Sequence, residues 1–221
     1  TNSFFPIVGG AEFVVHRLAE QWSRQGHEVA VFSGINGHID ERKINIDIKY
    51  EVRPFKVLRG TFKFCPHAFP FCFYNALSIK KGLDAFRPDY ISAHFGYPLG
   101  VWMSQIRPLP KYMVTCHGKD LTDAKWGYRH RYKGDKALVA ALNNSEAVVA
   151  ISSFARKQME GIGVAPDKIV DISNGVDINR FSADSMIDIR KQFNIPKEAI
   201  LLLSVGRNSQ DKDYATALKA F

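Results

Sequence analysis

The sequence predicts an α/β protein: a Rossmann-like open parallel sheet with helices on both faces, followed by a second, truncated domain. Three observations predict this class. Helical and extended patterns alternate along most of the chain, several expected strands are apolar on both faces, and polar residues follow directly after them. Strands that are apolar on both faces need helices on both sides of the sheet, and the crossover connections of parallel strands supply those helices.

The helices and strands are expected in a regular order. Apolar residues recur at positions 11, 14, 15, 18, 19 and 22, which predicts a first helix with Gly26 as its C-terminal cap. Further helices are expected over 74–86, 99–105, 136–142 and 154–160, and strands over 28–33, 89–94, 112–116, 147–151 and 169–172. Ser152 and Ser153 can cap the free amides of the helix at 154–160.

The pattern changes after residue 180, which indicates a domain boundary. We interpret 1–180 as an N-terminal Rossmann-like domain and 181–198 as a linker with a short polar helix. Residues 199–221 then hold the first strand, 199–205, and the first helix of a C-terminal domain. Because one strand and part of a helix cannot bury a core, we expect this second domain to be incomplete.

The composition narrows the classes of function. With 46% hydrophobic and 24% charged residues, the chain is typical of a folded protein, and no apolar run reaches the roughly 18–20 residues of a membrane span. The net charge of +8 favours an anionic partner: nucleic acid, a phosphorylated substrate or an acidic membrane surface. Three cysteines fit a reducing cytoplasm better than a disulfide framework, and the spacing of Cys65, His67 and Cys72 matches no zinc pattern.

Histidines follow two neighbouring strands of the predicted sheet. His94 ends the strand at 89–94, and His117 comes directly after the strand at 112–116. Ligands of open α/β sheets bind at the carboxyl ends of the strands, so both side chains are candidates for a site there. Gly118 lets the chain turn away, which would leave the His117 imidazole pointing into the crevice. A structural or merely exposed histidine would give the same pattern.

Two further segments could bind phosphate. Gly9-Gly10 precedes the first helix, where the backbone can approach a ligand and free amides attract anions, although a loop that needs positive φ would also use glycine. Arg207 and Lys212 follow the strand at 199–205, and two cations there suit a diphosphate. The spacing alone favours a solvated loop for that pair. No dinucleotide fingerprint or P-loop is present.

Aromatic and basic residues interleave over 53–81. This pattern fits an interfacial membrane patch, a hydrophobic acceptor site or a nucleic-acid stacking surface, and core aromatics with basic loops would also produce it.

Six stretches in this order resemble the family 4 glycosyltransferases, which have the two-domain GT-B fold. They are residues 5–12 (FPIVGGAE), 26–29 (GHEV), 117–120 (HGKD), 152–154 (SSF), 174–177 (NGVD) with Phe181, and 205–207 (VGR) with Lys212. The resemblance covers nearly the whole chain. It implies retaining transfer of a sugar, of hexosyl type, from a nucleotide-diphosphate donor to an acceptor hydroxyl in surface polysaccharide or glycolipid synthesis.

The resemblance also implies roles for individual residues. The catalytic residue would be His117, which would contact the transferred sugar. Gly9 and Gly10, with Arg207 and Lys212, would bind the donor diphosphate without a metal or cofactor, because prepositioned cations stabilise the charge of the leaving group. His94, Asp120 and His16 are assigned to the acceptor side. The expected partners are the nucleotide sugar, a glycan or lipid-linked acceptor and an anionic membrane at its cytoplasmic face, but not nucleic acid.

Departures from the family pattern qualify this interpretation. The family's first strand should precede Thr1, its paired-glutamate segment is not in these 221 residues, and Asp213 replaces the glycine that usually follows the loop lysine. We therefore expect this chain alone to be inactive. A non-catalytic glycan- or acceptor-binding module, a nucleotide-sugar 2-epimerase and a basic nucleic-acid-binding protein remain as alternatives.

Overall fold

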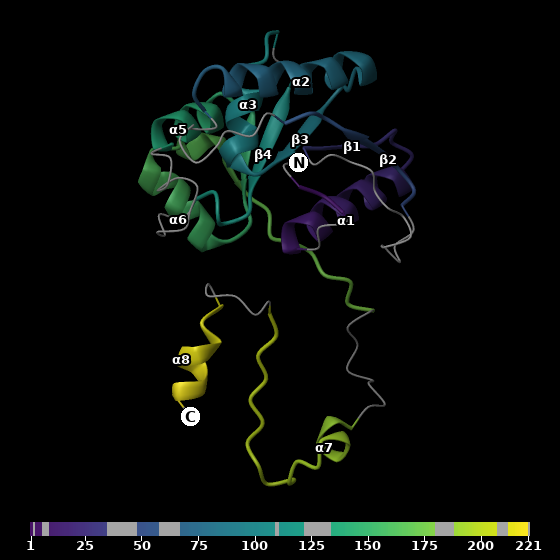
Figure 1. Ribbon diagram of the computed structural model, residues 1–221, viewed down its shortest axis with the longest axis vertical. Coiled ribbons are helices and arrows are strands. Elements are labelled where there is room, and N and C mark those ends of the chain that lie inside the picture. The colour runs from purple at the N-terminus through teal and green to yellow at the C-terminus, as the bar shows by residue number, and fades with distance from the viewer. Residues whose placement is uncertain are drawn as a thin grey trace. The chain divides into compact units, whose positions relative to one another are not determined.

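The computed structural model describes residues 1, 3–5, 9–34, 48–57, 67–108, 111–121, 134–179, 188–206 and 212–220. The chain divides into two compact units, Thr1–Gly175 and Val176–Phe221, which are described separately. The helices and strands of each are labelled in Figure 1. The predicted domain boundaries at 180 and 198 stay a prediction.

The first unit is built on parallel strands. The strands β3 (Ile91–His94), β4 (Tyr112–Cys116), β5 (Ala147–Ala150) and β6 (Ile169–Asp171) form a four-stranded sheet in that order. The strands β1 (Ala30–Ser33) and β2 (Glu51–Pro54) form a two-stranded parallel sheet. In the larger sheet His94 is in register with Thr115, and Cys116 with Ala150. The carboxyl ends of β3 and β4 therefore lie side by side, as predicted.

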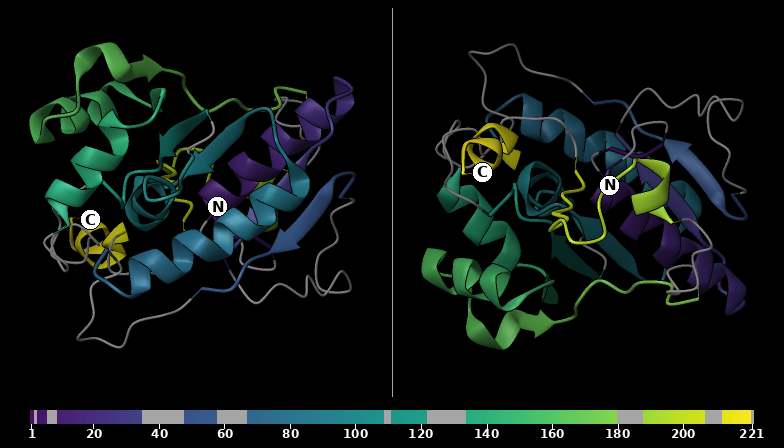
Figure 2. Two further views of the ribbon diagram at one scale, coloured as in Figure 1. Left: turned by 90° about the horizontal axis from the view of Figure 1, so that it is seen from above. Right: turned by 90° about the horizontal axis from the view of Figure 1, so that it is seen from below.

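Helices cover the strands on both sides. They are α1 (Gly10–Arg24), α2 (Phe71–Phe86), α3 (Val101–Met103), α5 (Asp135–Asn143) and α6 (Ser153–Ile162). The two faces are clearest at β1, because successive side chains of a strand point in opposite directions. Val31 joins the cluster that contains Val15 of α1, whereas the ring of Phe32 packs edge-on against Phe86 of α2. Seen from above and from below, α2 and α1 respectively lie in front of the strands (Figure 2).

The contact between β1 and α2 is close enough to exclude a larger side chain at Gly82. A Cβ atom there would lie 2.5 Å from a ring carbon of Phe32. We expect Gly82→Ala to lower the free energy of unfolding by about 1–3 kcal/mol, as measured by urea denaturation. Gly161→Ala is the matched control, since Gly161 is an exposed helical glycine with no atom within 4 Å of the new Cβ. It should stabilise by about 0.5–1 kcal/mol. Equal effects of both substitutions would contradict the close contact.

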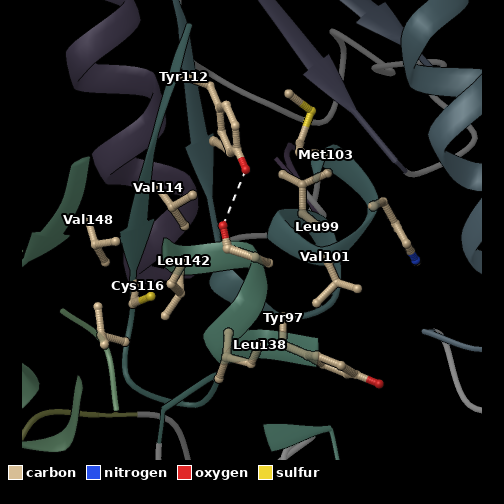
Figure 3. Close-up of a cluster of buried hydrophobic side chains, with 14 of the residues drawn as sticks. Tyr97, Leu99, Val101, Met103, Tyr112, Val114, Cys116, Leu138, Leu142 and Val148 are labelled. Atoms are coloured by element: carbon tan, nitrogen blue, oxygen red, sulfur yellow. Dashed lines mark hydrogen bonds between the residues drawn. The ribbon is translucent and has the colours of Figure 1, made fainter. Parts of the chain in front are cut away.

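The main core lies between β4, β5 and the helices α3 and α5. Figure 3 shows part of it, with Val114, Cys116 and Val148 from the strands beside Leu138 and Leu142 from α5. The hydroxyl group of Tyr112 donates a hydrogen bond to the carbonyl oxygen of Ala141, so this polar group within the cluster has a partner. The core fixes β4 against α5 and thereby holds the strand end from which His117 emerges.

Thr1 lies along the free edge of β1. Its amino nitrogen donates to the Phe32 carbonyl, and its own carbonyl accepts from the Gly34 amide. This is the hydrogen-bond pattern of a parallel neighbour of β1. A cavity of about 500 Å³ lies between β1 and β3. The strand that the resemblance implies before Thr1 stays a prediction.

Two local expectations differ from the structure. The sequence did not predict β2, a short strand whose end residues are exposed and which ends in Pro54. The helix expected over 99–105 is interrupted. A turn of wide helix at Gly96–Gly100, with extended backbone at Tyr97, precedes the three residues of α3. In the part of the chain that the structure describes, no helix has the length and hydropathy needed to cross a membrane.

The described residues of the second unit form the short helices α7 (Ile189–Gln192) and α8 (Tyr214–Lys219). The strand expected over 199–205 is not formed: residues 200–205 pair with no strand in the described ranges and are exposed. A strand is held by hydrogen bonds to a neighbour and by burial of at least one face, and this segment has neither. None of the described residues of this unit is buried.

Candidate functional site at the carboxyl ends of β3 and β4

His94 and His117 form a hydrogen-bonded pair at the carboxyl end of the sheet. The Nδ1 atom of His94 lies 2.9 Å from the Nε2 atom of His117, and the rings are nearly parallel, with their centroids 5.2 Å apart. His94 is buried, with 3% of its surface exposed, whereas His117 is partly exposed. Gly118 has a φ of +100°, so the chain turns away after His117 as predicted. His117 is thus the member of the pair that a ligand can reach.

Burial keeps both imidazoles neutral. It lowers the pKa of His94 well below its ordinary value, and the neighbouring His117 lowers it further. Burial also lowers the pKa of His117 to about 4, against the opposing effect of the Glu12 carboxylate. Since neutral imidazole both donates and accepts a hydrogen bond, the pair is suited to bind hydroxyl groups rather than to hold a fixed positive charge.

The depressed pKa values predict that stability depends on pH. A histidine with a folded pKa below its unfolded value binds its proton first in the unfolded state, so the free energy of unfolding falls as pH drops. For His117 this window runs from about 6.5 down to about 4 and corresponds to roughly 3 kcal/mol. Urea unfolding should show that the free energy of unfolding falls by about this amount between pH 7.5 and 4. In His117→Asn this fall should be smaller. An identical pH dependence in parent and variant would contradict it.

Asp120 ties the two strand-end loops together. It is fully buried, and its carboxylate accepts hydrogen bonds from the amides of Gly96, at 2.6 Å, and His117, at 3.0 Å. Burial raises the pKa of Asp120, and these amides and the thiol of Cys116 oppose the rise. In this conformation the carboxylate has no surface that an acceptor could touch. Asp120 therefore positions the backbone of His117, and the acceptor contact assigned to it stays a prediction.

Glu12, in the first turn of α1, acts electrostatically on His117. It is buried, its carboxylate accepts a hydrogen bond from the hydroxyl group of Ser3, and its charge acts on His117. Gly9 makes room for it, since a Cβ at Gly9 would lie 2.5 Å from the Glu12 carboxylate. Gly9 has an extended φ of −158°, so close approach and not positive φ explains this glycine.

Gly10 begins α1, and a Cβ atom added to it would meet no other atom within 4 Å. Within the described residues, no side-chain hydrogen bond caps the start of this helix. The dipole of a 15-residue helix adds positive potential there, which favours an anion, whereas the Glu12 carboxylate beside Gly9 opposes one. Their assignment to the donor diphosphate stays a prediction.

The remaining predicted site residues are not part of this cluster. His16 is buried, and its Nδ1 atom lies 2.8 Å from the Tyr50 hydroxyl group, within an aromatic cluster with Phe5. These contacts give His16 a role in packing, and its acceptor-side role stays a prediction. Arg207 lies outside the described residues, and Lys212 is exposed in the second unit.

The backbone conformation at Asp213 explains why the family pattern usually has a glycine at this position. Its φ of 46° lies in the left-handed region, which glycine adopts at least cost. Its carboxylate accepts a hydrogen bond from the Thr216 amide at the start of α8. The aspartate thus keeps the turn after Lys212.

The described residues contain no group of three or more side chains that could hold a metal ion. Within the same ranges Cys72 and Cys116 are free thiols, and Cys65 lies outside them.

Three residues of the cluster were not singled out in the sequence. Glu12 lies within the stretch FPIVGGAE, but nothing in the sequence indicated that its charge acts on His117. Ser92 lies two residues before His94, and its hydroxyl oxygen is 3.3 Å from His94 Nε2. The period of a strand places 92 and 94 on one face, so this contact could have been anticipated. Phe95, at a φ of 80°, packs its ring 5.1 Å from that of His117.

An open parallel sheet with its polar cluster at the carboxyl strand ends defines a Rossmann-like α/β protein, and its structural neighbours are GT-B glycosyltransferases. The chain belongs to Glycosyltransferase Family 4, whose family model matches residues 8–180.

Two curated proteins are similar in sequence. The putative teichuronic acid biosynthesis glycosyltransferase TuaC of Bacillus subtilis is 29% identical over 142 residues, which cover 62% of this chain and 34% of that protein. The uncharacterized glycosyltransferase MJ1607 of Methanocaldococcus jannaschii is 25% identical over 97% of this chain and 55% of its own length. The chain thus spans about a third to a half of these relatives.

Solved structures share the fold. Sucrose-phosphate synthase from Thermosynechococcus elongatus superposes with a TM-score of 0.72 at 18% identity, over 99% of this chain and 55% of that one. Anabaena Alr3699/HepE, solved in complex with UDP and glucose, gives a TM-score of 0.58 at 18% identity, over 88% of this chain and 48% of its own. At these identities the likeness concerns the fold alone.

Proposed function

We propose that this chain is the acceptor-side part of a retaining hexosyltransferase that moves a sugar from a nucleotide-diphosphate donor to an acceptor hydroxyl group. The observation that carries the proposal is the neutral His94–His117 pair at the carboxyl ends of β3 and β4. Membership of the family supplies the reaction class. A reachable neutral imidazole suits hydrogen bonds to sugar hydroxyl groups, which both donate and accept.

The donor side of the proposal rests on the glycine pair and on the loop cations. The free amides at Gly9 and Gly10 would meet the diphosphate, and Arg207 and Lys212 would neutralise the charge that develops on the leaving phosphate oxygen. No metal is required in this scheme. The Anabaena protein is described in complex with UDP-glucose, which supports a nucleotide sugar as the class of donor. The acceptor hydroxyl group would attack from the face of the leaving group, whose phosphate oxygen would take the proton.

The name of the Bacillus relative supports a role in surface polysaccharide synthesis. A lipid-linked or glycan precursor at the cytoplasmic face of a membrane would be the acceptor. The surface of α2 agrees with this: Phe73, Tyr74 and Leu77 are exposed on it near the basic Lys81, and Phe69 is exposed just before the helix. Aromatic side chains with neighbouring basic residues favour an anionic bilayer interface.

The chain should sediment with anionic vesicles at low salt, and Phe73→Glu should reduce the fraction that sediments. Failure of the parent to sediment would exclude the membrane contact.

The test of the function is a screen of nucleoside-diphosphate sugars against the full-length protein. Transfer to an added acceptor, with the anomeric configuration of the donor retained in the product, would support the proposal. Donor epimerisation without acceptor would indicate the epimerase alternative, and glycan binding without any turnover would indicate the binding module. Steeply salt-dependent binding of DNA or RNA would instead favour the nucleic-acid alternative.

A further inference from the structure

We propose that His94 is a positioning residue for His117: it holds the His117 ring in place, sets its tautomer and leaves Nδ1 of His117 as the atom that meets a sugar hydroxyl group. This inference rests on the proposed function, in which His117 contacts the transferred sugar. His94 itself is 3% exposed, so it acts through His117 and does not touch a substrate.

The geometry links three side chains in a row. The hydroxyl oxygen of Ser92 lies 3.3 Å from Nε2 of His94, and Nδ1 of His94 lies 2.9 Å from Nε2 of His117. Two ring nitrogens at that distance need one hydrogen between them: one nitrogen donates and the other accepts. The tautomer of His117 is therefore tied to that of His94, because the hydrogen bond of one ring nitrogen determines the state of the other.

The surroundings keep this arrangement in one state. Among the described residues, the Glu12 carboxylate of α1 acts on His117 and opposes its neutral state. Burial of the His117 ring outweighs this charge, and burial also keeps the His94 ring neutral. Phe95 packs against the ring of His117, and the Asp120 carboxylate holds its backbone amide. The backbone amide, the ring and the Nε2 atom of His117 therefore all have contacts within the described residues.

The other nitrogen of His117 is left for a ligand. Among the residues that the structure describes, Nδ1 of His117 has no hydrogen-bond partner, and His117 is the partly exposed member of the pair. A fixed tautomer makes this nitrogen either a constant donor or a constant acceptor toward the sugar. Pre-organisation of this kind lowers the cost of binding the transition state.

The structural arm of the test uses nitrogen-15 NMR on this chain. A scalar coupling across the hydrogen bond between His94 Nδ1 and His117 Nε2 is expected in the parent. In His94→Asn the side-chain amide can replace Nδ1, so His117 should keep its Nε2 shift, whereas His94→Leu should move it to that of an unbonded ring. His67→Leu is the matched control, because His67 bonds the Tyr97 hydroxyl group at 2.8 Å and should leave His117 unchanged.

The kinetic arm uses the full-length protein and a double-mutant cycle. His94→Leu should lower kcat/KM for transfer about tenfold, which is the value of one hydrogen bond, and His94→Asn should restore most of the loss. In a His117→Ala background, His94→Leu should have no further effect. A persistent loss there, or an absent coupling in the parent, would overturn the positioning role. If the parent shows no transfer at all, the proposed function fails, and the coupling alone decides whether His94 holds His117.

Discussion

Replacing His117 with alanine is expected to lower kcat/KM for sugar transfer by the full-length protein about 10²–10³-fold. His117 is the reachable member of the neutral pair at the carboxyl ends of β3 and β4, so its loss would remove the hydrogen bond that we propose it makes to the transferred sugar. The fold should survive, because the side chain is partly exposed and the backbone amide stays bonded to Asp120.

The control for this prediction is His27→Ala. His27 is exposed and lies before β1, at the opposite end of the strand from the site. Transfer by that variant should stay within about threefold of the parent, since surface substitutions away from a site have small effects. Equal losses for His27→Ala and His117→Ala, or normal transfer by His117→Ala with an intact circular dichroism spectrum, would exclude a role for His117 in the reaction.

The largest effect on stability is expected from Asp120→Ala. The substitution leaves the buried amides of Gly96 and His117 without their acceptor and removes the group that ties the loops after β3 and β4. Each unsatisfied buried donor costs about 1–3 kcal/mol, so the free energy of unfolding should fall by about 3 kcal/mol. Urea denaturation followed by circular dichroism measures it.

Two variants make the Asp120 result specific. Asp120→Asn keeps one carbonyl oxygen as an acceptor and should lose about half as much stability. Asp167→Ala removes an exposed carboxylate and should change stability by less than about 0.5 kcal/mol. If Asp120→Ala unfolds at the same urea concentration as Asp167→Ala, the two amide contacts are not holding the loops.

The fold was largely predictable because each apolar pattern agreed with its neighbours. Alternating helices and all-apolar strands leave little choice but a parallel sheet, and β3, β4 and β5 begin and end close to the expected residues. The sequence did not predict β2 because Glu51 and Arg53 interrupt any apolar run there. Its extended conformation depends on pairing with β1. The segment 199–205 reads as a strand from its apolar residues, but a strand also needs a partner.

The site was predictable only in its position. The ends of neighbouring parallel strands must meet, so His94 and His117 could be placed together from their spacing alone. Their hydrogen bond and the burial of one partner depend on side-chain packing, which the sequence does not encode locally. The same limit applies to Asp120, whose position in the motif HGKD indicated an acceptor contact, whereas its carboxylate is enclosed by backbone amides.

A side-by-side turnover assay with nucleotide sugars, on residues 1–221 and on the full-length protein, tests most directly whether this chain carries only part of an active site. None of the described residues of its second unit is buried. The expected result is sustained, configuration-retaining transfer by the full-length protein and none by the 221-residue chain. Sustained transfer by the 221-residue chain alone would contradict it.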